Sequence, residues 1–195
     1  EIQACDWSSD VCSSDLWLAD EIAGALTIID WGPDEKLIED IGREWLVGAN
    51  MVAPKAVLAA VGGFHPGLDR VGNNLLSSGD VFFQKEAMRL GYKCLYVPEI
   101  AIDHLAASSR LNQTWFVKRF YWQGVSDAAM RLIECPPGLL GRARLALGRA
   151  ASLLHSPGRI RALVMPTSDP AAFRAKCLAM IDIGFVAGVL GAARR

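Results

Sequence analysis

Two side chains in this sequence have types and positions that could support acid–base or metal chemistry. Asp80 opens a stretch with helical apolar spacing, so its carboxylate would lie at a helix N-terminus, where backbone N–H groups and the helix dipole favour a negative charge. Such a carboxylate can accept a proton from a hydroxyl, or it can simply cap the helix. His104 follows a predicted strand 24 residues later. Its imidazole could bind a divalent metal or the phosphates of a ligand, or it could be a hydrogen-bonded structural histidine.

Polar side chains before Asp80 could contact a ligand. Asn50 follows Gly48 on a predicted strand, and small residues there would allow the backbone to approach a site closely. Asn74 and Ser78 lie on a loop rich in Gly, Asn, Pro and Ser, which is long for a plain connection. Core packing of Asn50 and simple solvation of the loop residues are the structural alternatives.

Aromatic and cationic side chains follow His104. Trp115 and Arg119 lie on a predicted helix and combine a ring face, on which a sugar can stack, with a guanidinium that can neutralise phosphate. A helix packed on the domain with its charges in water is the alternative for this region.

Short strands and helices alternate around these residues. Apolar runs bounded by turn formers predict strands at 26–29, 45–52, 94–97 and 100–102. Apolar residues at helical spacing predict helices at 55–61, from Asp80 to 90, at 113–133, at 139–156 and at 176–195. Pro136, Pro137 and Gly138 break the long helix and mark a domain boundary between 135 and 136.

The charge of the chain is divided between its two parts. The net charge is −1, but residues 1–104 hold 7 Lys/Arg against 17 Asp/Glu, and residues 105–195 hold 13 against 4. With 52% hydrophobic residues the chain is neither disordered nor fibrous. The basic half predicts a polyanionic partner, and an anionic membrane surface is favoured because no nucleic-acid-binding motif accompanies the charge. We therefore expect no nucleic acid partner.

The cysteines indicate the redox compartment of the protein, and the first residues indicate where its natural sequence begins. The five cysteines form no C-x-x-C pair and have no histidine at zinc spacing, so reduced thiols in a cytoplasmic protein are expected. Residues 6–16 (DWSSDVCSSDL) match one reading frame of a common sequencing adapter. We therefore treat residues 1–16 as a non-native leader and expect this polypeptide to be a fragment.

Five short motifs resemble, in sequence and order, the C-terminal half of family 2 glycosyltransferases, which have a GT-A fold. The similarity covers roughly residues 26–130 and is carried by the following runs: VGANM (47–51), VGGF (61–64), LSSGD (76–80), GYKCLYVP (91–98) and Asp103-His104. It implies an α/β fold, namely a partial, Rossmann-like GT-A domain over residues 17–135, followed by a basic helical tail over residues 136–195.

The resemblance also implies a function. The whole protein would transfer a sugar from a nucleotide-sugar donor to a lipid-linked or polysaccharide acceptor, with Asp80 as general base and His104 as a ligand of a divalent metal (Mg²⁺ or Mn²⁺) or of the diphosphate. Asn50, Asn74, Ser78, Trp115 and Arg119 would contact the substrates. The family usually has an acidic residue before the base, and this sequence has Gly79 there.

One part of the family's site is missing from the sequence. The metal-binding D-x-D motif does not occur in residues 17–195. We therefore expect that the polypeptide alone neither binds a nucleotide sugar nor is active.

The sequence of the tail, residues 136–195, predicts that the protein is located at the membrane. Arginines interleaved with leucines over 142–163 are typical of a helix that lies on an anionic bilayer. The apolar run 177–193 contains Asp182, and we expect it to be interfacial or packed on the domain rather than to span the membrane. The predicted location is peripheral, on the cytoplasmic face of the cell membrane. A non-catalytic membrane-associated adaptor, in which Asp80 is only a cap, is the rival hypothesis.

Overall fold

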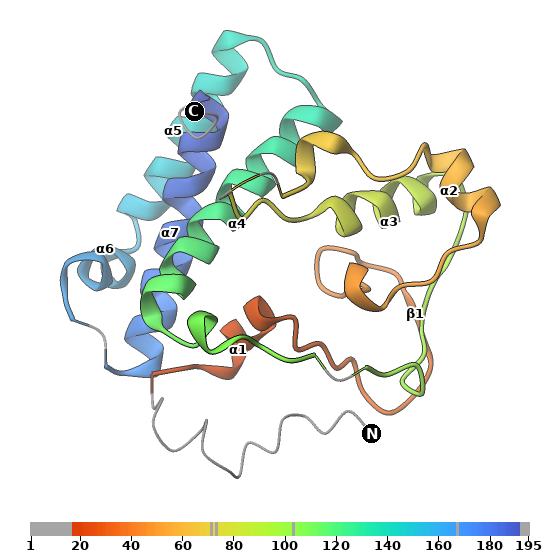
Figure 1. Ribbon diagram of the computed structural model, residues 1–195. Coiled ribbons are helices and arrows are strands. Elements are labelled where there is room, and N and C mark those ends of the chain that lie inside the picture. Colours follow the sequence, from red (N-terminus) through yellow and green to blue (C-terminus); the bar gives the residue numbers. More distant parts are fainter. Residues whose placement is uncertain (1–16, 71, 73, 103, 167, 192–195) are drawn as a thin grey trace.

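A computed structural model describes residues 17–70, 72, 74–102, 104–166 and 168–191 of the chain (Figure 1). The structure is mostly helical, with 59% helix, and over the described residues its only sheet is one antiparallel pair of strands. The prediction of an α/β fold with a Rossmann-like parallel sheet is therefore wrong for this chain. The predicted leader, residues 1–16, lies outside the described residues.

The elements follow one another as seven α-helices, two strands and four short 3₁₀ turns within the described ranges. The helices are α1 (Asp20–Ala23), α2 (Lys55–Val61), α3 (Gly79–Arg89), α4 (Gln113–Glu134), α5 (Leu139–Leu154), α6 (Pro157–Val164) and α7 (Pro170–Leu190). The strands are β1 (Lys36–Ile38) and β2 (Cys94–Tyr96), and the turns are η1 (Gly24–Leu26), η2 (Gly48–Asn50), η3 (Pro66–Leu68) and η4 (Ser108–Arg110).

The predicted helices form, whereas most of the predicted strands do not. Only the segment at 94–97 becomes a strand, and its partner β1 was not predicted. The segment 26–29 starts at the last residue of turn η1 and continues as irregular backbone, the segment 45–52 contains turn η2, and no strand is assigned at 100–102. A helix completes its hydrogen bonds within itself, but a strand needs a neighbouring strand, and the described chain provides these apolar segments with none.

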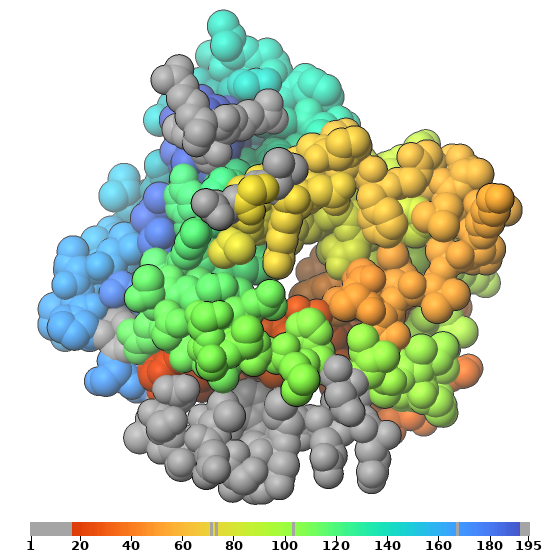
Figure 2. Space-filling view, viewed as in Figure 1, coloured from red at the N-terminus to blue at the C-terminus, as the bar shows by residue number. Residues whose placement is uncertain are grey.

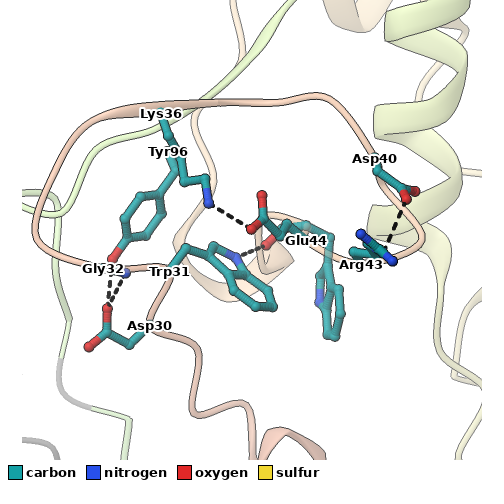
Figure 3. A network of polar contacts seen from close by, with 9 residues as sticks. Asp30, Trp31, Gly32, Lys36, Asp40, Arg43, Glu44 and Tyr96 are labelled. Carbon is teal, nitrogen blue, oxygen red and sulfur yellow. Dashed lines mark hydrogen bonds and ion pairs between the residues drawn. The ribbon is translucent and has the colours of Figure 1, made fainter.

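A network of polar contacts fixes the loop that leads into β1 and out of it (Figure 3). Asp30 Oδ1 accepts hydrogen bonds from the backbone N–H of Gly32 (2.8 Å) and from the hydroxyl of Tyr96 (3.3 Å) on β2. Lys36 pairs with Glu44 at 2.6 Å, and Trp31 Nε1 donates to the carbonyl of Trp45 (2.9 Å). These bonds replace part of the ladder that a larger sheet would supply.

Helices α4 and α7 pack against each other at very short range along most of their length. Phe116 packs against Phe173 near their N-terminal ends, and Gly188 lies against Ala128 near the other end, so the two helices run in the same direction. At the crossing, a Cβ atom added to Gly184 would overlap the carbonyl oxygen of Tyr121, and one added to Gly124 would overlap that of Ile181. Only glycine allows two helix backbones to come this close.

A buried carboxylate ties the basic tail together. Asp182 on α7 is 2% exposed and pairs with Arg149 of α5 (2.7 Å) and with Arg159 of α6 (2.8 Å). The apolar run was expected to be interfacial or packed on the domain, and in the structure α7 packs against other helices, with Phe173, Cys177 and Val189 fully buried. Among the described residues, no helix has both the length and the apolar character needed to cross a membrane.

The close approach of α4 and α7 at Gly184 predicts that two Gly→Ala substitutions change the free energy of unfolding very differently. In Gly184→Ala the new methyl group forces α4 and α7 apart, and we expect the free energy of unfolding to fall by about 3 kcal/mol or more. Gly148 on α5 is the matched control, because a Cβ there meets no atom within 4 Å. Gly148→Ala should raise the stability by about 0.5–1 kcal/mol. Urea unfolding followed by circular dichroism measures the free energy of unfolding of both variants. Equal changes in the two would contradict the close contact of α4 and α7 at Gly184.

Candidate active site around Asp80

The carboxylate of Asp80 is held at the N-terminal end of α3 by two backbone N–H groups. Its Oδ2 accepts a hydrogen bond from Gly48 (2.9 Å), and its Oδ1 accepts one from Val81 (2.9 Å). The side chain is half-buried, so it stays in reach of solvent or of a ligand. The predicted helix start is confirmed, and α3 begins one residue earlier, at Gly79.

The segment predicted to approach the site does so as a turn rather than as a strand. Gly48 opens η2, and a Cβ there would lie 3.2 Å from the Cβ of Asp80, so a small residue is needed for close approach. Asn50 closes the same turn and donates from Nδ2 to the carbonyl of Ile100 (2.7 Å). The turn thus has one end on Asp80 and the other on a different segment of the chain.

Gln84 fixes the backbone just before this turn. It is 1% exposed, and its amide bonds to both backbone groups of Leu46: Oε1 accepts from the N–H (2.8 Å) and Nε2 donates to the carbonyl (2.8 Å). Nε2 also donates to the carbonyl of Asp80, one helical turn earlier (2.9 Å). Gln84 therefore holds α3 and the η2 segment in register with each other.

Helix α4 bonds the loop before Asp80, in addition to the contacts that turn η2 makes with Asp80 itself. Ser126 Oγ accepts a hydrogen bond from the N–H of Ser77 (2.9 Å), and Gln123 Oε1 accepts one from the hydroxyl of Ser77 (3.1 Å). Ser78 is buried and has a left-handed backbone (φ 87°), which is unusual for a residue with a side chain. Its hydroxyl accepts a long bond from Gln123 Nε2 (3.4 Å). Figure 1 shows the N-terminal end of α3 directed toward α4.

Arg119 of α4 lies within the electrostatic range of Asp80. Burial, the largest cause, and the positive charge of Arg70 lower the pKa of its guanidinium, the carboxylates of Asp127 and Asp80 act in the opposite direction, and the net pKa is about 10. Burial also raises the pKa of Asp127, against the hydrogen bond from Gln123 and the nearby cations. The charges of Arg70, Asp127 and Asp80 therefore all act on the guanidinium of Arg119.

The charge of Arg119 is not neutralised by a direct ion pair. Its Nη1 donates to Gln123 (3.0 Å), but its Nε is buried with no hydrogen-bond partner, and no carboxylate of the described residues lies within 4.0 Å. A buried polar atom without a partner costs stability, and a bound anion is one arrangement that would satisfy it.

The predicted metal ligand His104 lies in a different place, a cavity of about 480 Å³. Asn50 lines the same cavity, but Asp80, Trp115 and Arg119 do not. Most of its wall is apolar, with the following side chains: Ile28, Ile29, Val47, Leu95, Ile100 and Ile102. Turn η2 therefore stands between the cavity and Asp80, with Gly48 against the carboxylate and Asn50 on the cavity side.

The described residues do not build a metal site around His104. Its Nε2 is buried without a hydrogen-bond partner, but no group of three or more His, Cys, Asp or Glu side chains gathers anywhere in the described ranges. Asp103, which precedes it, lies outside the described residues. The expected divalent metal therefore has one candidate ligand in this part of the chain and no complete set.

The remaining predicted substrate residues lie apart from one another. Trp115 packs on the apolar core that contains Ile22, Phe116 and Phe173, and the guanidinium of Arg110 lies 6.0 Å from its ring. Asn74 accepts a hydrogen bond from the N–H of Leu76 (3.3 Å), which is a local turn. The structure thus links Ser78 and Arg119 through Gln123 and places Asn50 on the turn that bonds Asp80, whereas His104 lines a cavity that Asp80 and Arg119 do not line.

Three residues of the site were missed in the sequence: Arg70, Gln84 and Gln123. Gln84 follows Asp80 by four residues and Gln123 follows Arg119 by four, which is the spacing of neighbours on a helix face. This spacing was a signal that could have found them. Arg70 lies on the loop before α3, and no pattern in the sequence marks it.

Comparisons with known proteins add no assignment, since no family model, no curated protein and no solved structure matches the chain.

The absence of an ion pair at Arg119 predicts that this arginine contributes nothing to the free energy of unfolding or lowers it. Arg119→Met removes a buried charge and one hydrogen bond, while Gln123 Oε1 keeps its bond from Ser77, so the free energy of unfolding should stay the same or rise by about 1 kcal/mol. Arg159→Met, the matched control, removes a cation paired with Asp182 and should lower it by about 2 kcal/mol. Urea denaturation of both variants checks this, and a comparable loss in Arg119→Met would mean that Arg119 is structural.

Proposed function

We propose that this chain carries the acceptor side of a glycosyltransferase site, in which Asp80 removes a proton from the attacking hydroxyl. The observation that carries the proposal is the placement of Asp80: a half-exposed carboxylate, fixed by the N–H groups of Gly48 and Val81, whose charge acts on Arg119, an arginine with no ion pair among the described residues. The order of sequence motifs that resembles family 2 glycosyltransferases supports the same chemistry.

The residues have separate roles in this proposal. The acceptor oxygen forms a bond to the anomeric carbon of the donor sugar, the bond from that carbon to the diphosphate breaks, and the proton of the acceptor moves to a carboxylate oxygen of Asp80. Negative charge grows on the departing diphosphate. Arg119, on which the charge of Asp80 acts, is the cation of this site that can stabilise the negative charge of the diphosphate.

The donor and the acceptor are a nucleotide sugar and a lipid-linked or polysaccharide hydroxyl, respectively. Because no group of three or more potential metal ligands gathers in the described chain, no step is assigned to a metal. Donor binding belongs to a part of the enzyme that contains a D-x-D motif, and we propose that the protein needs that part for turnover.

The proposal predicts the effect of removing one carboxylate. In the protein encoded by the gene together with its upstream sequence, Asp80→Asn should lower the rate of sugar transfer by about 10²–10⁴-fold, because the amide cannot accept the proton. Transfer of a radiolabelled sugar from UDP-, GDP- and dTDP-linked donors to a membrane extract measures the rate.

A second acid-to-amide change serves as the control. Asp40→Asn alters an exposed carboxylate that accepts a hydrogen bond from Gly42 and pairs with Arg43, both within its own turn, so transfer should be unchanged. Wild-type turnover in Asp80→Asn would exclude Asp80 as the base. If the wild-type protein transfers no sugar from any of these donors while Asp80→Asn folds normally, the non-catalytic adaptor is favoured instead.

A further inference from the structure

The charges of the tail are distributed unevenly between its inner and outer surfaces. Residues 139–165 contain five arginines and no aspartate or glutamate. Arg149 and Arg159 point inward to Asp182, and they lie on the same helix faces as the buried residues Ala146 and Ala162, three positions away. Asp182 therefore neutralises arginines on the inner faces of α5 and α6 and sets the rotation of both helices.

The outer face of α5 is apolar and exposed. Leu140, Leu147 and Leu154 follow one another at intervals of seven residues, about two helical turns, and are 69%, 70% and 70% exposed. Arg144 lies between the first two of them on the same face and forms no ion pair with any described residue. We call the surface formed by Leu140, Arg144, Leu147 and Leu154 the leucine stripe.

The outer face of α6 has the same character. Val164 is 80% exposed, and Arg161, three residues earlier, is exposed beside it. Figure 2 shows atoms of α5 and α6, in cyan and blue, on the outer surface of the molecule. Isolated exposed leucines are common on proteins, but three in one row flanked by unpaired arginines on an acid-free segment are not.

We propose that the leucine stripe, together with Arg161 and Val164, docks on an anionic lipid bilayer. Leucine side chains can enter the region between headgroups and acyl chains, and the arginines next to them remain at the level of the phosphates. A second copy of the same face is a poor partner, because a symmetric contact would place Arg144 and Arg161 against the same cations. Nucleic acid would pair with the arginines but would leave the leucines in water. The proposal does not depend on sugar transfer.

Vesicle sedimentation of the purified full chain tests the proposal. The probes are vesicles of phosphatidylcholine alone and vesicles with about one third phosphatidylglycerol, each at about 0.1 M and about 1 M salt, where the screening length falls from about 10 Å to about 3 Å. We expect binding to the anionic vesicles at low salt, with little binding to the neutral vesicles and a clear loss at high salt.

Two glutamate substitutions on α5 distinguish the contribution of the leucine stripe to vesicle binding from the contribution of net charge. Leu147→Glu places an acid within the stripe and should weaken binding by at least tenfold. Ser152→Glu adds the same charge on the same helix, at an exposed position off the stripe, and should weaken it by about fivefold or less, the effect of one elementary charge near an anionic surface. Circular dichroism checks that both variants fold.

Each other outcome overturns the proposal. No binding of the wild-type chain to anionic vesicles, or equal binding to neutral ones, would exclude an anionic bilayer as the partner. Equal losses in the two variants would mean that general charge attraction acts and that the stripe does not insert. If light scattering finds an oligomer that Leu147→Glu dissociates, and the wild-type chain does not sediment with vesicles, the stripe is an interface between copies.

Discussion

The structure depends on the close contact between the backbones of α4 and α7. Gly124 and Gly184 remove the side chains that would otherwise separate the two helices, so each backbone lies directly on the other. Helix α4 then presents Arg119, Gln123 and Ser126 toward the loop before α3, and α7 presents Asp182 toward α5 and α6. The candidate active site and the basic tail are thus built on opposite sides of one helix pair, and both rely on the same pair of glycines.

The sequence predicted the helices well and the sheet poorly, for a physical reason. Helix signals are local: the apolar spacing of 113–133 and the break at Pro136 and Pro137 led to nearly correct bounds for α4 and α5. A strand pattern in the sequence describes only one strand, whereas the hydrogen bonds of a sheet also require a neighbouring strand. The apolar segments near residues 28, 47 and 101 have strand composition, yet they line a cavity as irregular chain. The GT-A fold that the motifs implied is not formed by the described residues.

The site was predicted in part. Asp80 at a helix start and the small residue Gly48 near it followed from residue type and position, and the structure joins them by a hydrogen bond. The pairing of Asp80 with His104 in one site stays a prediction, since His104 lines a cavity that Asp80 does not line. The arginines of the tail looked equivalent in the sequence. Which of them faces inward could not be predicted, because it depends on a single acid, Asp182, located more than twenty residues away along the chain.

The parallel course of α4 and α7 makes the connection between them a spacer of defined length. Helix α4 has 22 residues and is about 33 Å long, and the chain must travel back over that distance before α7 can begin. Helix α5, with 16 residues and about 24 Å, covers most of this return path, and α6 and the turns around it complete the connection. Shortening α5 by more than a turn or two would therefore leave the start of α7 out of reach of its place beside α4.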